Sequence, residues 1–415
     1  MTSIATRTND LTRLATPPVA ANSDDGRVAK HVVWVNQHAD FSGGAEHYIY
    51  NTVNLLREYG VRSTLLYDVA GEISPRFTQA FAGAHPLVDA RRQLDEIAPD
   101  LIYAHRVEGV AAVEQLLESS IPVLRFFHDH KLFCLREHKY TTLGHQTCTK
   151  QTGLGCYACL GFVERSGDWP GVKLHGLGGL RAEQEANKRF AGFAVGSSYM
   201  AEHVASHGFD AERVHALPLY ARRPDDTPEP AKHANQLVFA GSLVRGKGLD
   251  TLLLALARVA QPVRLIVAGD GRQGETYRAM VDQLNLADRV EFVGRLPSDE
   301  LTHLVRGSTA LVVPSRSPET FGLSGLEALS WGVPVIATDV GGMGEWLRNE
   351  ETGLATPAGD DGALAAAIER LLSDDELVER LGGRGRELYF ERFTPEQHVE
   401  RLIDVFESIV SSIQG

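Results

Sequence analysis

The segment 314–342 carries the residue types with the clearest chemical meaning in the chain. A predicted strand ends there, the chain turns through Pro and Ser, and Gly322 then leads into a predicted helix. The first N–H groups of such a helix, near Leu323, have no partner within it and can bind a phosphate or pyrophosphate. The spacing therefore predicts an anion site.

Two carboxylates accompany this anion site. Glu327 comes early in the predicted helix, where it can accept two hydrogen bonds from a vicinal diol such as a ribose. Glu319 lies eight positions earlier, in the loop that faces the same pocket. Such a pair suits a charged nucleotide that carries a polyhydroxylated group, and a solvated acidic face is the alternative.

All four cysteines of the chain lie close together in the sequence. Cys134, Cys148, Cys156 and Cys159 follow the pattern C-x13-C-x7-C-x2-C. Because four thiolates can close a tetrahedral site, this pattern predicts a structural zinc in an insertion at 131–170. Free thiols, and a redox or iron–sulfur role, are the alternatives.

The elements that position these residues follow from the apolar pattern. Short β-branched runs alternate with amphipathic stretches in two blocks, 30–220 and 236–395. We expect a doubly wound parallel sheet in each block, and hence two Rossmann-like α/β domains that face an interdomain cleft. Strands are predicted at 31–36, 63–67, 101–104, 123–127, 193–195, 237–241, 264–269, 290–294, 311–314 and 334–338.

Three further segments complete the predicted organisation. Residues 1–29, rich in Thr, Ser, Ala and Asn, predict a mobile tail. Residues 221–235 combine prolines with charges of both signs, which is typical of a linker. Thr394 is a candidate N-cap for a last helix, and we expect residues 396–415 to return to the N-terminal domain.

Charge and hydropathy exclude several classes of function. The 415-residue chain has a net charge of −13, which argues against a protein that mainly coats nucleic acid. Most of this acidity lies in 236–415, with 27 acidic and 17 basic residues. No stretch approaches the roughly 18 apolar residues of a membrane span, and 1–29 lacks the apolar core of a secretory signal, so we expect a cytoplasmic protein.

A basic segment interrupts the near-neutral first block. Residues 131–150 hold four basic side chains and one acidic side chain. This excess could face an anionic acceptor or the inner surface of a membrane, which would make the contact with the membrane peripheral. A solvated basic loop is the alternative.

Several motifs, in order along the chain, resemble one known family. ETFGLSGLEAL, with Glu319 and Glu327, followed by WGVPVIATDVGG, resembles the signature of retaining glycosyltransferases of family 4. Further resemblances are GGAEHYIYNTVNLLREYG (43–60), FFHDH (126–130), VGSSYMAEHV (195–204) and AGSLVRGKGLDTLL (240–253). The resemblance covers 31–412 and implies the two-domain GT-B fold.

The resemblance also implies a donor site in the C-terminal domain. Glu327 would hold the ribose hydroxyls, and Gly322 and Leu323 would offer backbone N–H groups to the pyrophosphate, with Phe321 in the same donor-binding set. Glu319 would contact hydroxyls of the transferred sugar. The C-terminal block would therefore be the nucleotide-sugar domain, and the N-terminal block the acceptor-side domain.

On the N-terminal side, the resemblance implies roles for a glycine turn and a histidine. Gly43 and Gly44 would let the backbone approach the sugar phosphate or the acceptor closely. His128 would hydrogen-bond the donor sugar near the reacting carbon. A satisfied buried histidine at a strand end is the alternative reading of His128.

Arg245 and Lys247 are the cations that would address the diphosphate. Negative charge grows on the leaving phosphate as a nucleotide-sugar bond breaks, so two cations aimed there stabilise the transition state more than the ground state. They would replace a metal ion, and we expect catalysis to need no cofactor. The arginine that the family places after the glycine is Ser242 here, which leaves the part played by Arg245 open. Arg295, within 294–301, is a candidate contact for the base.

The expected activity is the transfer of a hexose-type sugar from a UDP- or GDP-sugar to a hydroxyl acceptor. The family implies retention of configuration and a place in cell-surface polysaccharide or glycoconjugate biosynthesis, with a glycan, lipid-linked or small-molecule acceptor. No carboxylate stands out as a covalent nucleophile. Our hypothesis is therefore a same-face displacement in which a donor phosphate oxygen receives the acceptor's proton.

Two rival functions remain open on the sequence. Gly269-x-Gly271-x-x-Gly274 matches the dinucleotide fingerprint of an NAD-dependent oxidoreductase, although it follows the second predicted strand of its domain and not the first. A sugar-nucleotide epimerase, a phosphorylase or a non-catalytic subunit could share the fold. A non-catalytic subunit should have lost part of the site, yet all of the expected side chains are present.

Overall fold

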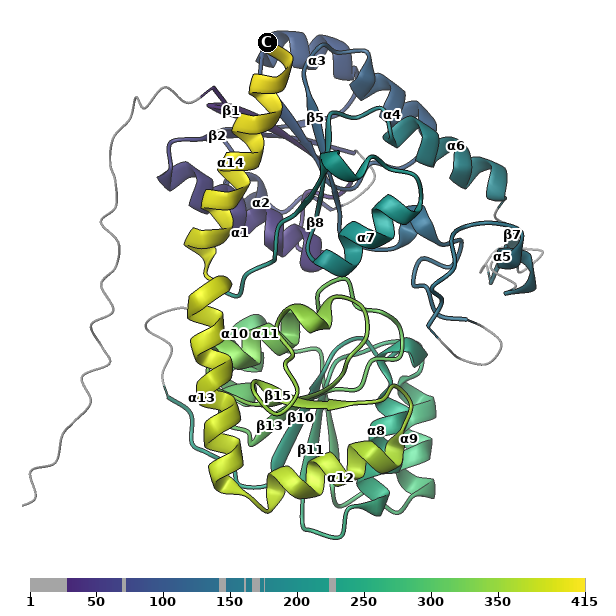
Figure 1. Ribbon diagram of the computed structural model, residues 1–415, viewed down its shortest axis with the longest axis vertical. Coiled ribbons are helices and arrows are strands. Elements are labelled where there is room, and N and C mark those ends of the chain that lie inside the picture. Colours follow the sequence, from purple (N-terminus) through teal and green to yellow (C-terminus); the bar gives the residue numbers. More distant parts are fainter. Residues whose placement is uncertain are drawn as a thin grey trace, which may run out of the picture.

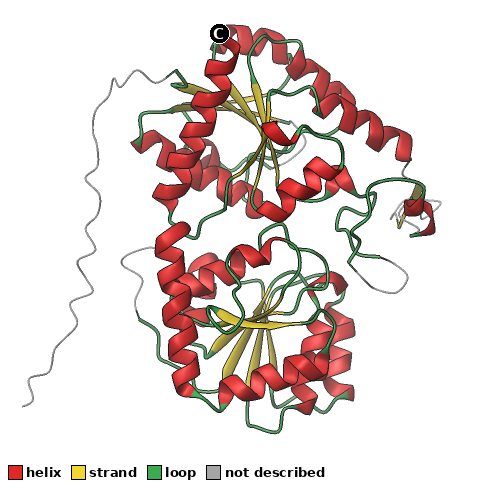
Figure 2. Cartoon of the chain, in the orientation of Figure 1, coloured by secondary structure: helices red, strands yellow, loops and turns green. Residues whose placement is uncertain are grey.

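The computed structural model describes residues 28–68, 72–141, 147–159, 162–165, 172–174, 176–223 and 229–414. They form two α/β lobes, one above the other in Figure 1, each with a sheet between layers of helices (Figures 1 and 2). The expected tail lies outside the described residues except for Val28 and Ala29, and so do residues 224–228 of the expected linker.

The N-terminal domain is built on a seven-stranded parallel sheet with the order β3-β2-β1-β4-β5-β8-β9. Alternate residues of β1 face two different cores, with Val32 and Trp34 in one and Val33 and Val35 in the other. A strand covered on both faces has no polar side, and this explains its unbroken apolar run. The strands are β1 (His31–Asn36), β2 (Arg62–Tyr67), β3 (Gly83–Pro86), β4 (Leu101–Ala104), β5 (Val123–Phe127), β8 (Gly192–Val195) and β9 (Val214–Ala216).

Helices cover both faces of this sheet, with α1 and α14 on one face and α3, α4, α6 and α7 on the other. The short helix α5 (Gly155–Ala158) and the antiparallel pair β6 (Val163–Arg165) and β7 (Val172–Leu174) project to one side (Figure 1). The other helices are α1 (Gly44–Glu58), α2 (Pro75–Thr78), α3 (Ala90–Ile97), α4 (Val110–Leu117), α6 (Leu177–Asn187), α7 (Ser198–Ser206) and α14 (Pro395–Gln414).

The C-terminal domain repeats this plan with a six-stranded parallel sheet of order β12-β11-β10-β13-β14-β15. Helices α8, α9 and α12 pack on one face and α10 and α11 on the other, while α13 contributes side chains to both cores. The strands are β10 (Gln236–Ala240), β11 (Arg264–Ala268), β12 (Val290–Gly294), β13 (Ala310–Val313), β14 (Val335–Thr338) and β15 (Gly353–Thr356). The helices are α8 (Leu249–Arg258), α9 (Gly274–Gln283), α10 (Ser298–Arg306), α11 (Leu323–Ser330), α12 (Asp361–Leu372) and α13 (Asp375–Arg392).

Helix α14 crosses from the C-terminal domain to the N-terminal one. It continues from α13 along one side of both lobes (Figure 1). Val399, Leu402 and Phe406 are fully buried in the same core as Trp34. At the far end, the Glu407 carboxylate accepts hydrogen bonds from the backbone of Val28 and Ala29, at 3.0 and 3.2 Å.

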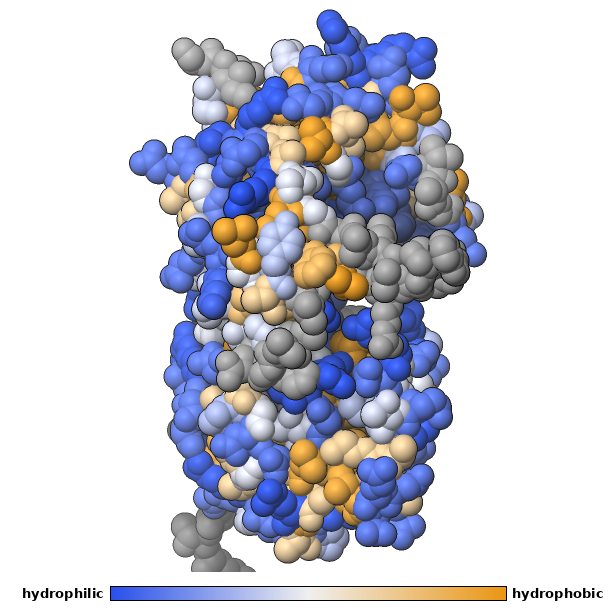
Figure 3. Space-filling model, turned by 90° about the vertical axis from the view of Figure 1, so that its right-hand side faces the viewer, coloured by the Kyte–Doolittle hydropathy of each residue, from blue (hydrophilic) through white to orange (hydrophobic). Residues whose placement is uncertain are grey.

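These observations confirm the prediction of two doubly wound Rossmann-like α/β domains, which is the GT-B architecture. None of the helices described here combines the length and the apolar character that crossing a bilayer requires. The face shown in Figure 3 is mostly hydrophilic, with separate small apolar patches.

Candidate active site at the domain junction

Each sheet reverses its strand order at one point, between β1 and β4 in the N-terminal domain and between β10 and β13 in the C-terminal domain. Loops that leave the carboxyl ends of the strands diverge at such a switch point, and ligands bind there in open α/β sheets. The residues that the sequence singles out lie in the loops after β1 and β5 and after β10, β12 and β13.

Loops of the two domains meet at these switch points. The hydroxyl of Thr320, after β13, donates to the backbone carbonyl of His128, after β5, at 3.0 Å. Ser197 Oγ donates to the carbonyl of Thr320 at 2.7 Å, and the backbone N–H of Ser198 donates to Glu345 Oε1 at 2.6 Å. We call this junction the interdomain site.

Lys247 and Glu319 form an ion pair on the C-terminal side of the interdomain site. Lys247 Nζ lies 2.7 and 3.0 Å from the two carboxylate oxygens of Glu319, and Ser315 Oγ donates to one of them at 2.6 Å. Burial disfavours the charged form of Glu319, but the Lys247 charge and these hydrogen bonds outweigh it and lower the pKa of the carboxyl. Glu319 is therefore an ionised hydrogen-bond acceptor.

Helix α11 begins at the same switch point. Gly322 precedes it in the left-handed conformation, with φ +78°, and a Cβ there would lie 2.8 Å from Met343. Both the conformation and the close approach require glycine. Among the described residues no side chain caps the helix, which leaves the N–H groups around Leu323 available to an anion.

The side chain of Phe321, a predicted donor-binding residue, lies in the core of the C-terminal domain. Its side chain is only 1% exposed and its ring centroid lies 6.0 Å from that of Phe393. Its carbonyl accepts a hydrogen bond from Trp346 Nε1 at 2.8 Å. Phe321 therefore packs beneath the loop and holds it, because a side chain this deep in the core cannot reach a ligand.

Glu327 lies in the second turn of α11 with its side chain exposed. No residue that the structure describes pairs with its carboxylate. The surrounding protein nevertheless removes enough water from this group that burial raises its pKa to about 7. An unpaired acidic group beside a helix N-terminus is available to accept hydrogen bonds from a ligand's hydroxyls.

The two predicted cations differ in their surroundings. Arg245 and Lys247 are the first and last residues of one 3-10 helix after β10, but only Lys247 pairs with Glu319, and the Arg245 side chain is exposed. Ser242 is exposed on the same loop. Arg295 directly follows β12 and is also exposed.

Arg316 braces the loop that carries these cations. Its guanidinium donates to the carbonyl of Arg245 at 3.1 Å and forms an ion pair with Asp250 at 2.5 Å. The cysteine-bearing insertion contacts this residue, because Thr147 Oγ1 donates to the carbonyl of Arg316 at 2.8 Å and the guanidinium lies 5.9 Å from the Tyr140 ring centroid. The insertion thus reaches the C-terminal domain next to the predicted phosphate contacts.

His128 directly follows β5, opposite the Glu319 loop. Its Nε2 lies 2.7 Å from Nδ1 of His105, which directly follows β4. Burial, reinforced by the charges of Arg106 and Arg125, lowers the pKa of His128 to about 3. Both the predicted role of His128 as a sugar contact and its reading as a satisfied buried histidine stay open on this geometry.

The glycine turn lies at the N-terminal switch point. Gly43 precedes α1 without a side-chain cap, and a Cβ on Gly44 would meet nothing within 4 Å. Glu46, in the first turn of α1, is fully buried, with one carboxylate oxygen that has no partner among the described residues. Asn36 and Arg106 approach its other oxygen at 3.3 and 3.8 Å. Among the described residues, the space around Gly44 is therefore open, whereas a Cβ on Gly43 would lie 3.2 Å from the Glu46 carboxylate.

The sequence analysis did not identify four polar residues of the interdomain site, namely Glu46, His105, Arg106 and Ser315. Each lies just after a strand or in the first turn of a helix at a switch point. Their position in the loops after β4 and β13, and at the start of α1, is the signal that could have identified them.

The four cysteines are free and partly exposed. Within the described parts of the chain, no three His, Cys, Asp or Glu side chains lie close enough to hold a metal ion. The spacing of the thiols along the sequence does not fix where their side chains point, and residues 142–146, 160–161 and 166–170 of the insertion lie outside the described residues. The structural zinc at Cys134, Cys148, Cys156 and Cys159 stays a prediction.

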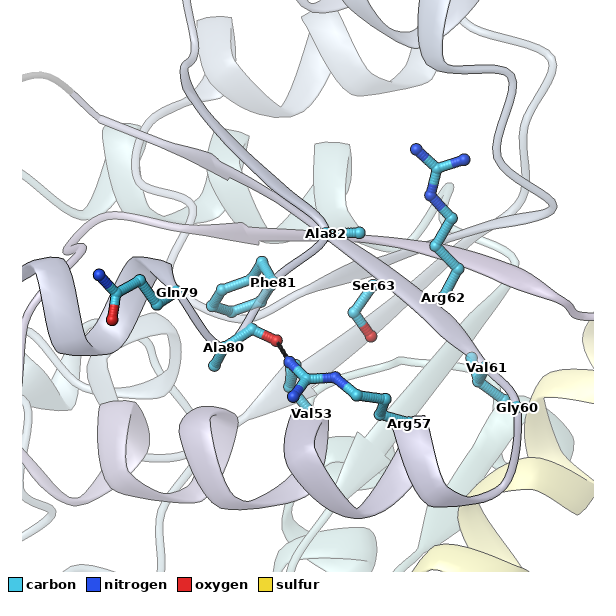
Figure 4. A pocket seen from close by; sticks show the side chains of 10 residues that line it. All are labelled: Val53, Arg57, Gly60, Val61, Arg62, Ser63, Gln79, Ala80, Phe81 and Ala82. Atoms are coloured by element: carbon cyan, nitrogen blue, oxygen red, sulfur yellow. Dashed lines mark hydrogen bonds between the residues drawn. The ribbon is translucent and has the colours of Figure 1, made fainter.

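A hollow of about 470 Å³ lies elsewhere in the N-terminal domain. Figure 4 shows Arg57, Arg62, Ser63 and Gln79 around it, between α1 and the segment that precedes β3. It opens at the amino ends of β2 and β3, whereas His128 follows the carboxyl end of β5. This hollow is not part of the interdomain site.

The glycines of the dinucleotide-like motif have a packing role. Cβ atoms on Gly269 and Gly271 would lie 1.9 and 2.7 Å from the backbone carbonyls of Gly241 and Leu243. The turn follows β11, next to the first strand of its sheet, whereas a dinucleotide fold places this turn after the first strand. The close contact with the loop after β10 explains these glycines without a dinucleotide.

Comparison of the sequence with known families gives a match over residues 224–388 to the family described as glycosyl transferases group 1. N-acetyl-alpha-D-glucosaminyl L-malate synthase of Bacillus anthracis is 31% identical over 176 residues, which is 42% of this chain and 45% of that protein. D-inositol 3-phosphate glycosyltransferase of Acidothermus cellulolyticus is 32% identical over 187 residues, 42% of this chain and 41% of that protein. The chain thus spans less than half the length of these curated relatives.

Solved structures match over most of the chain. Anabaena Alr3699/HepE in complex with UDP and glucose superposes with a TM-score of 0.67 at 19% identity, covering 91% of this chain and 100% of that one. Sucrose-phosphate synthase of Thermosynechococcus elongatus gives a TM-score of 0.65 at 21% identity, with 92% and 100% coverage. The comparisons thus show similarity to glycosyl transferases group 1 over residues 224–388 and a GT-B fold over most of the chain.

Proposed function

We propose that the protein is a retaining glycosyltransferase of family 4. It transfers a hexose-type sugar from a UDP- or GDP-sugar to a hydroxyl acceptor, in the synthesis of a cell-surface polysaccharide or glycoconjugate. The C-terminal domain binds the donor and the N-terminal domain binds the acceptor, at the interdomain site.

One observation carries this proposal, namely the arrangement of Lys247, Glu319 and Glu327 around the start of α11. The helix N-terminus and the ammonium group suit a diphosphate, and the ionised Glu319 suits the hydroxyls of a sugar. Glu327, which has no protein partner among the described residues, suits a ribose diol. A nucleotide-sugar is the ligand class that presents all three groups together.

The net charge of the C-terminal domain makes this local arrangement necessary. The domain is acidic overall, and a nucleotide-sugar is an anion, so the global field opposes binding. Lys247, the exposed Arg245 and the α11 N-terminus supply positive potential only where the diphosphate would lie.

In the proposed reaction, the bond between the anomeric carbon and the diphosphate breaks as the acceptor oxygen approaches from the same face. Lys247 and Arg245 stabilise the charge that develops on the leaving diphosphate, whose oxygen takes the acceptor's proton. Glu319 orients the sugar through its hydroxyls, and His128 contacts the same sugar from the N-terminal domain. No protein group forms a bond to the sugar in this scheme.

The acceptor is a glycan, a lipid-linked molecule or a small molecule, and the protein works in the cytoplasm, at the inner face of the membrane when the acceptor is lipid-linked. The insertion lies beside the acceptor side and carries the predicted structural zinc. Its contact with Arg316 links it to the phosphate-facing loop.

The proposal is tested first by the donor. Thermal shifts with UDP- and GDP-sugars should show a gain of about 2.7 kcal/mol in stability when the donor is present at about 100 times its Kd. Purified protein should then release UDP or GDP from the same donor, and NMR of the product should show the retained anomer. An inverted linkage contradicts the mechanism, and epimerised free nucleotide-sugar identifies an epimerase instead.

A further inference from the structure

His105 is a buried histidine with no part in the proposed reaction so far. Its side chain is 1% exposed, its Nδ1 lies 2.7 Å from His128 Nε2, and its Nε2 has no hydrogen-bond partner among the described residues. Burial and the neighbouring His128 and Arg125 lower its pKa well below the usual value, so both imidazoles are neutral near pH 7.

The ring of His105 is held in a fixed orientation. It stacks on Trp34 with an interplanar angle of 4° and a centroid distance of 5.0 Å, and on Phe126 at 5.8 Å. Its backbone N–H donates to the carbonyl of Val35 at 2.8 Å. This packing on both faces holds the plane of the His105 ring beside His128, with Nδ1 toward His128 Nε2.

Two neutral imidazoles can share one proton across this contact in only two ways. If His128 donates through Nε2, the proton of His105 lies on Nε2 and is a buried N–H without an acceptor. If His105 donates through Nδ1, its Nε2 carries no proton and is an acceptor without a donor. Buried N–H groups without an acceptor are rarer in proteins than buried acceptors without a donor, which favours this second arrangement. The second arrangement puts the His128 proton on Nδ1.

We infer that His105 is a positioning residue that fixes His128 in the Nδ1–H form, so that His128 donates a hydrogen bond to an oxygen of the transferred sugar and is not the base that accepts the acceptor's proton. The inference rests on the proposed function for the identity of the ligand. His128 Nδ1 fits this role because it is not among the buried unpartnered atoms and bonds no described residue.

The tautomer is measured without any substrate. Two-bond 1H–15N correlation spectra of histidine-labelled protein at pH 7.5, with His128 assigned by loss of its signals in His128→Gln, should show the proton on Nδ1. His105→Asn offers an amide N–H in place of Nδ1 and should keep this pattern, whereas His105→Phe should move the His128 proton toward Nε2. A wild-type His128 with its proton on Nε2 overturns the inference by itself.

The kinetic consequence is measured with the donor found in the thermal-shift screen. His105→Phe should lower kcat about tenfold with a change of less than about threefold in donor KM, and His105→Asn should stay within about threefold of wild type. His203→Phe is the matched control, because His203 is another buried histidine of this domain, and it should leave both values unchanged. If His105→Phe has the same kcat as wild type, the positioning role is contradicted. If the wild-type protein neither binds nor turns over a nucleotide-sugar, the proposed function is refuted, and the spectra still report the tautomer of His128.

Discussion

The two switch points of the molecule have the same topology and opposite chemistry. The C-terminal one holds a pre-formed Lys247–Glu319 ion pair and, within the described parts of the chain, a helix start without a side-chain cap and a Glu327 without a partner. The N-terminal one holds two neutral histidines in contact, a buried Glu46 and open space before Gly44. The family match lies wholly on the C-terminal side, at 224–388. Under the proposed function, the ion pair and the uncapped helix start would meet the donor, and the neutral histidines and Glu46 would face the acceptor.

Among the substitutions considered, loss of Lys247 should reduce catalysis most severely. Lys247→Ala removes the cation aimed at the leaving diphosphate, so kcat should fall by about 10²–10³-fold, as for loss of other groups that stabilise developing charge. Steady-state donor hydrolysis and transfer measure this. Arg264→Ala removes an exposed cation of the same domain and should leave kcat unchanged. A Lys247→Ala enzyme with near wild-type kcat would show that the leaving group is stabilised elsewhere.

Glu327 should give the donor side a pH dependence that the N-terminal side lacks. Because its pKa is raised to about 7, falling pH protonates it and removes a charged acceptor, so donor affinity should weaken as the pH drops below 7. At pH 8, Glu327→Gln should raise the donor Kd about 30-fold.

Calorimetry at several pH values separates these effects. The Glu327→Gln protein should show a nearly flat pH dependence, while Glu300→Gln, an exposed acid on α10, should behave as wild type. An unchanged donor affinity in Glu327→Gln would count against the assignment of the ribose contact.

Two glycine substitutions sharpen the comparison between the halves. Gly322→Ala would bring a methyl within 2.8 Å of Met343 at a positive φ, so it should lower the stability by about 1–3 kcal/mol.

Gly44→Ala meets no described residue within 4 Å, so the variant should melt as wild type does but have a kcat/KM about tenfold lower if a ligand approaches the turn. Thermal melts and kinetics on the same samples test both, and a fully active Gly44→Ala would place the ligand elsewhere.

The cysteine insertion should give the smallest catalytic effect. If it holds a structural zinc, purified protein should contain about one zinc per chain, and Cys156→Ser should lose the metal and melt several degrees lower, with kcat within about threefold of wild type. Metal analysis and thiol titration decide this. Less than about 0.2 zinc per chain with four titratable thiols would refute the site.

The sequence predicts the central strands well because strands buried on both faces leave unbroken apolar runs, as His31–Asn36 and Leu101–Ala104 do. It misses β3 and β9 because each is short and lies at an edge of the sheet, where Gly83–Pro86 and Val214–Ala216 are only partly buried. Short strands that are only partly buried lack the apolar run on which the prediction depends.

The residues of the site are predicted by type, but their contacts are not. Lys247 and Glu319 are 72 positions apart, so their ion pair exists only once β10 and β13 lie side by side. His105 lies in no recognisable sequence motif. Its contact with His128 arises only because β4, which precedes His105, pairs with β5, which precedes His128. Phe321 is a predicted donor-binding residue, and only the packing against Phe393 shows that its side chain faces inward.

The crossing of α14 has a consequence for the order in which the protein is made. Val399, Leu402 and Phe406 complete the N-terminal core, yet the ribosome adds them after the whole C-terminal domain. During synthesis the sheet face that α1 and α14 share must therefore wait without α14, and the apolar surface left uncovered exposes a nascent chain to aggregation or to chaperones. The half of the molecule that emerges first is the half that can finish folding only last.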